Sequence, residues 1–160
     1  MKKALLILVL LPIAIIVFAP GLNSDLNTKI EKWLSSSAEL TQGNLSLALE
    51  INGIKASQIV EAQSCLETGY FQSSLCTRHN NLFGMKRPLK RLTTAIGATS
   101  EGFAIYDCWY DSVKDMKLFQ EFYQSRGRDL TNYMQFLSSI DYAQDPYYLF
   151  KIRRICITSR

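Results

Sequence analysis

Residues 62–86 read AQSCLETGYFQSSLCTRHNNLFGMK. The apolar spacing at the start of this segment predicts an amphipathic helix, which ends at Gly69 shortly after a carboxylate, Glu67. Three aromatic residues accompany that acid in the segment: Tyr70, Phe71 and Phe83. Burial among such side chains disfavours the charged form of a carboxyl group and keeps it protonated. Glu67 is therefore the candidate for general acid chemistry.

A small β lobe is predicted after this segment. Residues 92–96 and 103–106 have the composition of strands, and residues 97–102 can make the reversal between them. Glu101 stands in that turn and is the candidate for a second catalytic carboxylate. Turn residues are commonly polar for solvation alone, so this structural explanation stays open beside the functional one.

The rest of the chain is predicted to be mostly helical. Helical spacing is found at residues 25–40 with Ser24 as cap, at 45–51, from about 56 to 68 with Ser57 as cap, at 107–126, and at 130–140 with Asp129 as cap. Asp145 and Pro146 then have the pattern of a last helix start. The apolar face of that helix is predicted to hold Tyr148, Leu149 and Ile152. Short helices around one inserted hairpin predict an α+β fold, mainly helical, with a cleft between its lobes.

Composition and charge exclude some classes of protein. The chain has 160 residues, 48% of them hydrophobic and 11% aromatic, which fits one packed domain. Lys2 and Lys3 account for two of the 18 basic residues, so the remainder is nearly balanced against 14 acidic ones. This mild charge gives no support for nucleic-acid binding.

The N-terminal residues predict export. Lys2 and Lys3 precede an apolar run over residues 4–19, which has the form of a secretory signal. We expect residues 1–20 to be a signal peptide or a membrane anchor, and both readings stay open because Pro20 is an awkward position for cleavage. Residues 21–43 are predicted to form a linker and an N-terminal helix. The expected location is the periplasm or cell envelope.

The four cysteines are Cys65, Cys76, Cys108 and Cys156. Export permits disulfides, and four thiols allow three complete pairings, but buried free cysteines are an equal alternative. No pair has the C-x-x-C spacing, and His79 is the single histidine of the sequence. A zinc site is therefore not expected, and neither is another cofactor.

Four separated segments resemble one family, in one order: LETGY at 66–70, NNLFGMK at 80–86, YDCWYDSVKD at 106–115 and YAQDPYY at 142–148. They are similar to the signature of bacterial peptidoglycan endo-β-N-acetylglucosaminidases, glycoside hydrolase family 73. That family includes the hydrolase domain of the flagellar rod-cap protein and many autolysins. Ordered matches are more specific than any single motif. The resemblance covers about residues 44–155, and we expect the catalytic domain at 44–160.

The resemblance implies a lysozyme-like fold and hydrolysis of the β-1,4 bond after N-acetylglucosamine, with Glu67 as proton donor. It also implies that Tyr142 lines the catalytic cleft, with a structural hydrogen bond to a neighbouring helix end as the alternative. Rings that can stack on sugars and amides that can bind them are further candidates for substrate contact: Tyr70, Phe71, Phe83, Tyr106, Asn80 and Asn81. Core packing is the competing explanation for the rings, and bonding to local backbone is favoured for the asparagines.

Alternatives stay open for the group that assists Glu67 and for the class of reaction. An inverting enzyme needs a base roughly 6.5–9.5 Å from the acid, a role for Glu101, whereas assistance by the substrate's acetamido group needs no protein base. A lytic transglycosylase also uses one acid, but its typical Gly-Leu-Met-Gln segment is absent and Asn-Leu-Phe-Gly stands at 81–84. A non-catalytic protein that binds or assembles on the cell wall is the third reading.

Overall fold

The computed structural model describes residues 20–158, and helix α3 (Ser57–Thr68) lies at the centre of the fold. The other helices in the described residues are α1 (Pro20–Ser36), α2 (Gln42–Ile51), α4 (Ser74–His79), α5 (Trp109–Gln124), α6 (Tyr133–Ser139) and α7 (Tyr148–Thr158). One antiparallel pair of short strands, β1 (Gly97–Ala98) and β2 (Ala104–Ile105), forms the sheet. The predicted α+β, mainly helical fold is confirmed.

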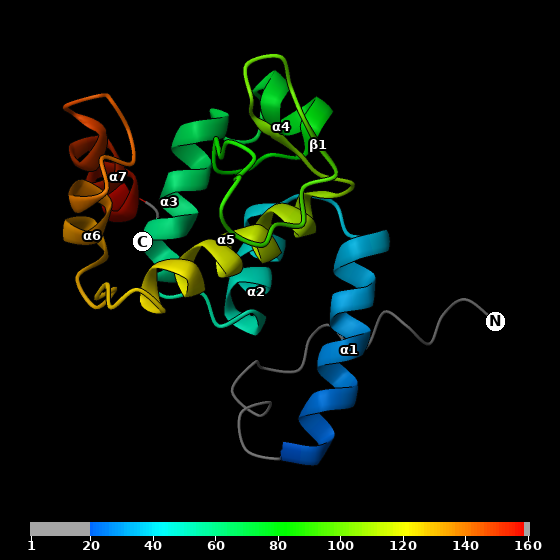
Figure 1. Ribbon diagram of the computed structural model, residues 1–160. Coiled ribbons are helices and arrows are strands. Elements are labelled where there is room, and N and C mark those ends of the chain that lie inside the picture. The colour runs from blue at the N-terminus through cyan, green and yellow to red at the C-terminus, as the bar shows by residue number, and fades with distance from the viewer. Residues whose placement is uncertain (1–19, 159–160) are drawn as a thin grey trace.

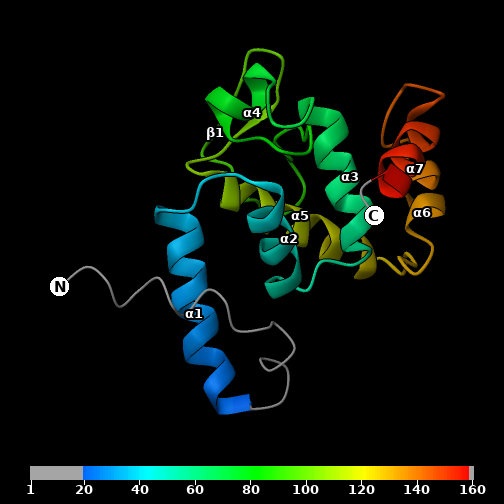
Figure 2. The ribbon, with the colours of Figure 1, turned by 180° about the vertical axis from the view of Figure 1, so that it is seen from behind.

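Helix α3 packs against α7 on one side and α2 on the other, and α4 and the β1–β2 hairpin gather near the α3 C-terminal end (Figure 1). Helix α1 projects from the body on the side away from α6 and α7, in both views (Figures 1 and 2). The last residues of α3 therefore lie where the helical part meets the small lobe.

The hairpin is shifted from its predicted position. Strand β1 begins at Gly97, so the prediction of a strand over residues 92–96 is wrong. The threonine side chains there bond backbone outside the sheet: Thr93 accepts from the nearby Ala95 N–H (3.0 Å), and Thr94 donates to the distant Asp111 carbonyl at the start of α5 (2.7 Å). The predicted reversal is present as the turn before β2, where Thr99 N–H donates to the Phe103 carbonyl (2.8 Å).

A third extended segment joins the hairpin to the loop that follows α4. Lys86 pairs with Phe103 in an antiparallel bridge, and the Met85 carbonyl accepts from the Ala104 N–H (2.9 Å). The chain that leaves Gly84 is thereby held along the inner edge of the small lobe. This connection fixes the backbone at Gly84.

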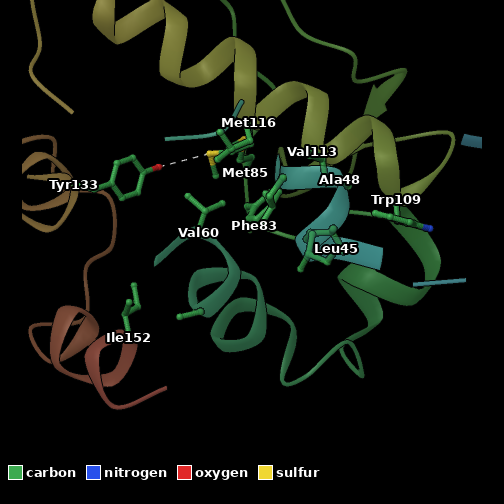
Figure 3. Packing of buried hydrophobic residues seen from close by; sticks show 14 of the residues in the cluster. Leu45, Ala48, Val60, Phe83, Met85, Trp109, Val113, Met116, Tyr133 and Ile152 are labelled. Carbon is green, nitrogen blue, oxygen red and sulfur yellow. Dashed lines mark hydrogen bonds between the residues drawn. The ribbon is translucent and has the colours of Figure 1, made fainter. Parts of the chain in front are cut away.

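The hydrophobic core fills the space between α2, α3, α5 and α7. Its fully buried members include Leu45 of α2, Val60 of α3, Val113 of α5 and Ile152 of α7. Figure 3 shows Phe83, from the loop after α4, among the side chains of this cluster. The loop that carries Gly84 is therefore anchored in the core one residue earlier.

Several helix starts differ from the predictions. Helix α1 begins at Pro20, so Ser24 lies inside it and the expected linker at 21–24 is helical. Ala56 in a left-handed conformation (φ +53°), and not Ser57, precedes α3. Asn132 caps α6 by accepting from the Gln135 N–H (3.2 Å), while Asp129 binds Thr131 just before it.

No disulfide joins any of the four cysteines, all of which lie within the described residues. Residues 20–158 contain no group of three His, Cys, Asp or Glu side chains that could hold a metal ion. Over the same residues, none of the helices combines the length and apolar character that crossing a membrane requires. Residues 1–19 of the predicted signal or anchor at 1–20 lie outside the described residues.

Candidate active site

The candidate acid Glu67 lies in the last turn of α3, half-buried, just before the helix ends at Gly69. Thr68 organises this end: its hydroxyl donates to the Ser64 carbonyl (2.6 Å) and accepts from the Phe71 N–H (2.8 Å). The chain then turns sharply, with φ of +54°, +56° and +69° at residues 69–71. Two of these residues are not glycine, a strained arrangement that proteins concentrate at functional sites.

Gly84 forms one wall around the Glu67 carboxyl group. A Cβ atom added to Gly84 would stand 2.8 Å from Glu67 Oε2, closer than real Cβ contacts, and 3.3 Å from Glu67 Cδ, which is a tight contact. The backbone here also has φ +62°, which glycine adopts without strain. Only a glycine at this position lets the backbone approach the carboxyl group so closely. The sequence contained Gly84 within a matching motif, but its contact with the acid was not predicted.

Tyr148 of α7 forms a second wall, and sequence reasoning missed it. Its hydroxyl is hydrogen-bonded to the Glu67 carboxyl group and accepts from Gln63 Nε2 (3.2 Å). The side chain is buried. The motif at 142–148 predicted a site tyrosine, but periodicity assigned Tyr148 to the apolar face of a helix. Packing of α7 on α3 turns that buried face toward the acid.

Tyr142, the predicted site tyrosine, contacts both Tyr148 and the loop that carries Gly84. Its ring stacks on the Tyr148 ring with centroids 5.8 Å apart, and its hydroxyl donates to the Phe83 carbonyl (2.9 Å). That bond holds the peptide just before Gly84. The bond is structural, as the alternative for Tyr142 expected, but its acceptor lies in the loop after α4 and not at a helix end. Tyr142 also stands next to the candidate acid's own partner, Tyr148.

The electrostatic surroundings favour the neutral form of Glu67. Burial raises the pKa of its carboxyl group, and the hydrogen bond from Tyr148 offsets part of this rise because it stabilises the carboxylate. Glu67 takes part in none of the ion pairs found among the described residues. Burial likewise raises the pKa of Tyr142 and of Tyr148, and the nearby Glu67 charge adds to both effects. A protonated acid among neutral tyrosines is what a proton donor requires.

Glu101, the candidate second acid, lies exposed in the turn between β1 and β2. Hydrogen bonds from Ser100, from its own backbone and from Thr99 lower the pKa of its carboxyl group, with a smaller contribution from Lys86. Arg87 N–H donates to the Gly102 carbonyl (3.0 Å), so Arg87 lies opposite Gly102. Glu101 is one residue further toward the tip of the hairpin turn. Arg87 lies three residues beyond Gly84, the residue that contacts Glu67, which corresponds to roughly 10 Å of extended chain. Glu101 is thus not brought into contact with Glu67.

Three residues expected to contact substrate lie in the interior instead. Phe83 is 1% exposed within the core, and Tyr106 is 2% exposed with its hydroxyl donating to Asp115 Oδ2 (2.8 Å). Asn81 is 0% exposed and bonds four backbone groups, those of Phe83 N–H, Met85 N–H, Met85 C=O and Ala104 C=O. The competing explanations, core packing and backbone bonding, therefore describe all three in this structure.

Asn80 also serves the backbone, while the turn after α3 offers exposed rings. Asn80 ends α4 with φ +55°, and its amide donates to the carbonyls of Tyr106 (3.1 Å) and Asp107 (3.0 Å). Tyr70 is 60% exposed, whereas Phe71 is half-buried against the core. Of the predicted rings, Tyr70 is the one with a free face beside Glu67 in the chain.

Two open hollows on the surface lie away from these residues. One is lined by residues 89–92 and the C-terminal half of α5, and the other by the start of α3 together with α6 and α7. None of the predicted site residues lines either hollow. The contacts of Glu67, and not either of these hollows, therefore define the candidate site.

Comparison with known protein families identifies the domain that contains Glu67. The family model Glucosaminidase, described as mannosyl-glycoprotein endo-beta-N-acetylglucosaminidase, matches residues 44–159. The chain belongs to this family. The match confirms the predicted family, and it supports a glycoside hydrolase with peptidoglycan endo-β-N-acetylglucosaminidase activity. No curated protein and no solved structure matched the chain.

The glucosaminidase match spans every residue of the Glu67 site. It covers Gly84, Tyr142 and Tyr148 as well as the acid, so all four belong to the family domain. The family places the protein's substrate in the cell envelope.

Proposed function

We propose that this glucosaminidase cleaves the β-1,4 bond after N-acetylglucosamine in peptidoglycan with Glu67 as general acid. The observation that supports the proposal is a half-buried carboxyl group without a cationic partner, between the Gly84 backbone and the Tyr148 hydroxyl. Burial raises its pKa, so a larger fraction holds a proton near neutral pH.

The first step is protonation of the leaving sugar. The Glu67 carboxyl group transfers its proton to the glycosidic oxygen as the bond from that oxygen to C1 breaks, and the acid becomes a carboxylate. The Tyr148 hydroxyl donates to the carboxylate that results, so it stabilises the charge that develops on the acid during the step. Water finally adds to C1, and its proton returns to Glu67.

The substrate's acetamido group is the proposed partner of Glu67 in this reaction. Its carbonyl oxygen attacks C1 as the bond breaks, and water then opens the ring that forms. Glu101 is the weaker candidate because it is exposed, has a lowered pKa and lies at the far end of the hairpin. A lowered pKa makes a carboxylate a poor base toward water.

The glycan strand is proposed to run past the turn after α3. Tyr70 offers an exposed ring there, and flat sugar faces stack well on such rings. Phe71 is proposed as a second, less accessible contact at the same turn. In this proposal Tyr142 positions Gly84, because its hydroxyl holds the carbonyl of the preceding residue, Phe83.

Export to the cell envelope is part of the proposal. Peptidoglycan lies outside the cytoplasmic membrane, so the enzyme must cross it to reach this substrate. Lys2, Lys3 and the apolar residues 4–19 have the composition of a signal peptide or membrane anchor. Fractionation of cells, with the N-terminal residue of the mature protein determined by mass spectrometry, tests export and distinguishes cleavage from retention.

Mass spectrometry of fragments released from purified peptidoglycan tests the reaction. The expected products end in reducing N-acetylglucosamine. Anhydro-muramyl ends would instead identify a lytic transglycosylase, and binding to the wall without soluble products would identify a non-catalytic protein.

The variant Glu67→Gln tests the acid, because it keeps the shape and removes the proton. We expect a loss of about 10²- to 10⁴-fold in turnover, the usual contribution of a general acid. The matched control is Glu61→Gln on the same helix, whose carboxylate accepts from Gln42 (2.8 Å) and Ser46 (2.7 Å) and not from the site. Comparable rates for Glu67→Gln and Glu61→Gln would reject Glu67 as the acid.

A further inference from the structure

Gln63 is a completely buried polar residue one helical turn before Glu67 on α3. Positions four apart lie on one face of a helix, so both side chains point toward α7. The Gln63 amide nitrogen donates to the Tyr148 hydroxyl (3.2 Å), and its Oε1 atom has no hydrogen-bond partner. A buried amide with an unused oxygen is costly, so its presence calls for a function.

The hydroxyl of Tyr148 has one proton to give and accepts through its lone pairs. Gln63 Nε2 is a donor, so it occupies a lone pair and cannot take the proton. The proton is then free for the Glu67 carboxyl group, to which Tyr148 is also bonded. The order of donors therefore runs from Gln63 to Tyr148 to Glu67.

The reverse orientation of the same amide would change this order. Gln63 Oε1 would then face the Tyr148 hydroxyl and compete with Glu67 for its proton. In the observed orientation the oxygen is the atom left without a partner. The unpaired Gln63 oxygen is unfavourable in free energy, but the orientation that leaves it unpaired also leaves the Tyr148 proton to be donated toward Glu67.

We propose that Gln63 is a positioning residue of the hydrolytic reaction: by donating to Tyr148 it directs the tyrosine proton to one oxygen of Glu67, which leaves the other oxygen to deliver its proton to the glycosidic bond. The proposal rests on Glu67 being the general acid. The two ionisable groups that interact electrostatically with Glu67 in the described structure are Tyr142 and Tyr148, and both are neutral near pH 7.

The test is a double-mutant cycle with Gln63→Met and Tyr148→Phe, measured as full pH–rate profiles on peptidoglycan. Methionine keeps the length and volume of glutamine without a donor. We expect Gln63→Met to lower kcat about tenfold, equivalent to about 1.4 kcal/mol in the barrier, with little change in KM. Its alkaline limb should move to higher pH, because a freely rotating Tyr148 hydroxyl stabilises the Glu67 carboxylate less well.

The double variant identifies the route of the effect. If Gln63 acts through Tyr148, Gln63→Met should change neither kcat nor the alkaline limb once Tyr148 is phenylalanine. Additive effects in the double variant would overturn the proposal, as would an unshifted alkaline limb in Gln63→Met. Gln63→Glu is the second variant should Gln63→Met not fold: its carboxylate accepts the Tyr148 proton, so the alkaline limb should again move upward, and an unchanged limb overturns the proposal.

Gln120 provides the matched control. It is a buried glutamine on α5 whose side chain binds the Lys55 N–H (2.8 Å) and carbonyl (3.0 Å), outside the site. Gln120→Met should lower the Tm without moving the alkaline limb. Glu67→Gln separates the two proposals: if it is inactive while Gln63→Met is unchanged, the general acid stands and only the Gln63 inference fails. If Glu67→Gln is active, both fail.

Discussion

Replacing Gly84 by alanine should disable the site without unfolding the domain. The added Cβ would stand 2.8 Å from Glu67 Oε2, some tenths of an ångström inside normal contact, so the carboxyl group must move. A left-handed conformation (φ +62°) costs an L-residue about 1–2 kcal/mol, partly offset by about 0.4–1 kcal/mol from the more restricted unfolded chain. Because a misplacement of about 1 Å can cost about 100-fold in rate, we expect kcat to fall about 10- to 100-fold.

Gly127→Ala isolates the contact from the backbone cost. Gly127 is also left-handed (φ +75°), but nothing lies within 4 Å of an added Cβ. Both variants should therefore lose similar stability, within about 1 kcal/mol, or a few degrees in Tm for a domain of this size. Release of soluble fragments from labelled peptidoglycan, measured below both Tm values, gives the rates. A Gly84→Ala enzyme as active as Gly127→Ala would refute the close approach of Gly84 to a working acid.

Wild-type activity should fall as the pH rises through the pKa of Glu67, which lies above the usual carboxyl value, because only the protonated acid can donate. Tyr148→Phe removes a hydrogen bond to the ionised form of Glu67, so it should move this alkaline limb to higher pH in a pH–rate series. Asp115→Asn should destabilise the fold by about 3 kcal/mol in denaturant titrations, because it weakens the buried pair with Arg91 (2.7 Å) and leaves its guanidinium uncompensated. Burial raises the pKa of Asp115, but hydrogen bonds from Arg91 and other groups outweigh it and lower the pKa. The ion pair therefore stabilises the fold above about pH 4, and this contribution is lost as the pH falls through the folded pKa. Acidification should lower the free energy of unfolding of Asp115→Asn less than that of the wild type. Asn81→Ala should cost at least about 2 kcal/mol, because it leaves buried backbone groups without partners, and a shift of the urea midpoint measures it.

The fold was largely predictable because its elements depend on local patterns. Apolar spacing placed the helix that carries Glu67, and Gly69 marked its end, since only a left-handed residue fits there. The first hairpin strand was placed too early because residues 92–96 have strand composition. In the structure Thr94 donates to the distant Asp111 carbonyl, and Leu92 and Ile96 are exposed. Composition describes what a segment can form, and hydrogen bonds from distant residues decide what it does form.

The candidate acid was predictable, and its surroundings were not. Glu67 was a lone carboxylate in an aromatic segment, which a sequence displays directly. Its partners Gly84 and Tyr148 stand in other segments, and their contacts depend on how α7 and the small lobe pack on α3. Aromatic type alone also could not separate exposed Tyr70 from buried Tyr106, because both kinds of position favour a large ring.

The position of Tyr148 near the end of the domain affects when the enzyme matures. Glu67 emerges from the ribosome or the export channel with α3, whereas the hydroxyl that binds it arrives with α7, the last described helix. A nascent chain therefore carries its candidate acid through most of synthesis without the tyrosine hydroxyl that binds it.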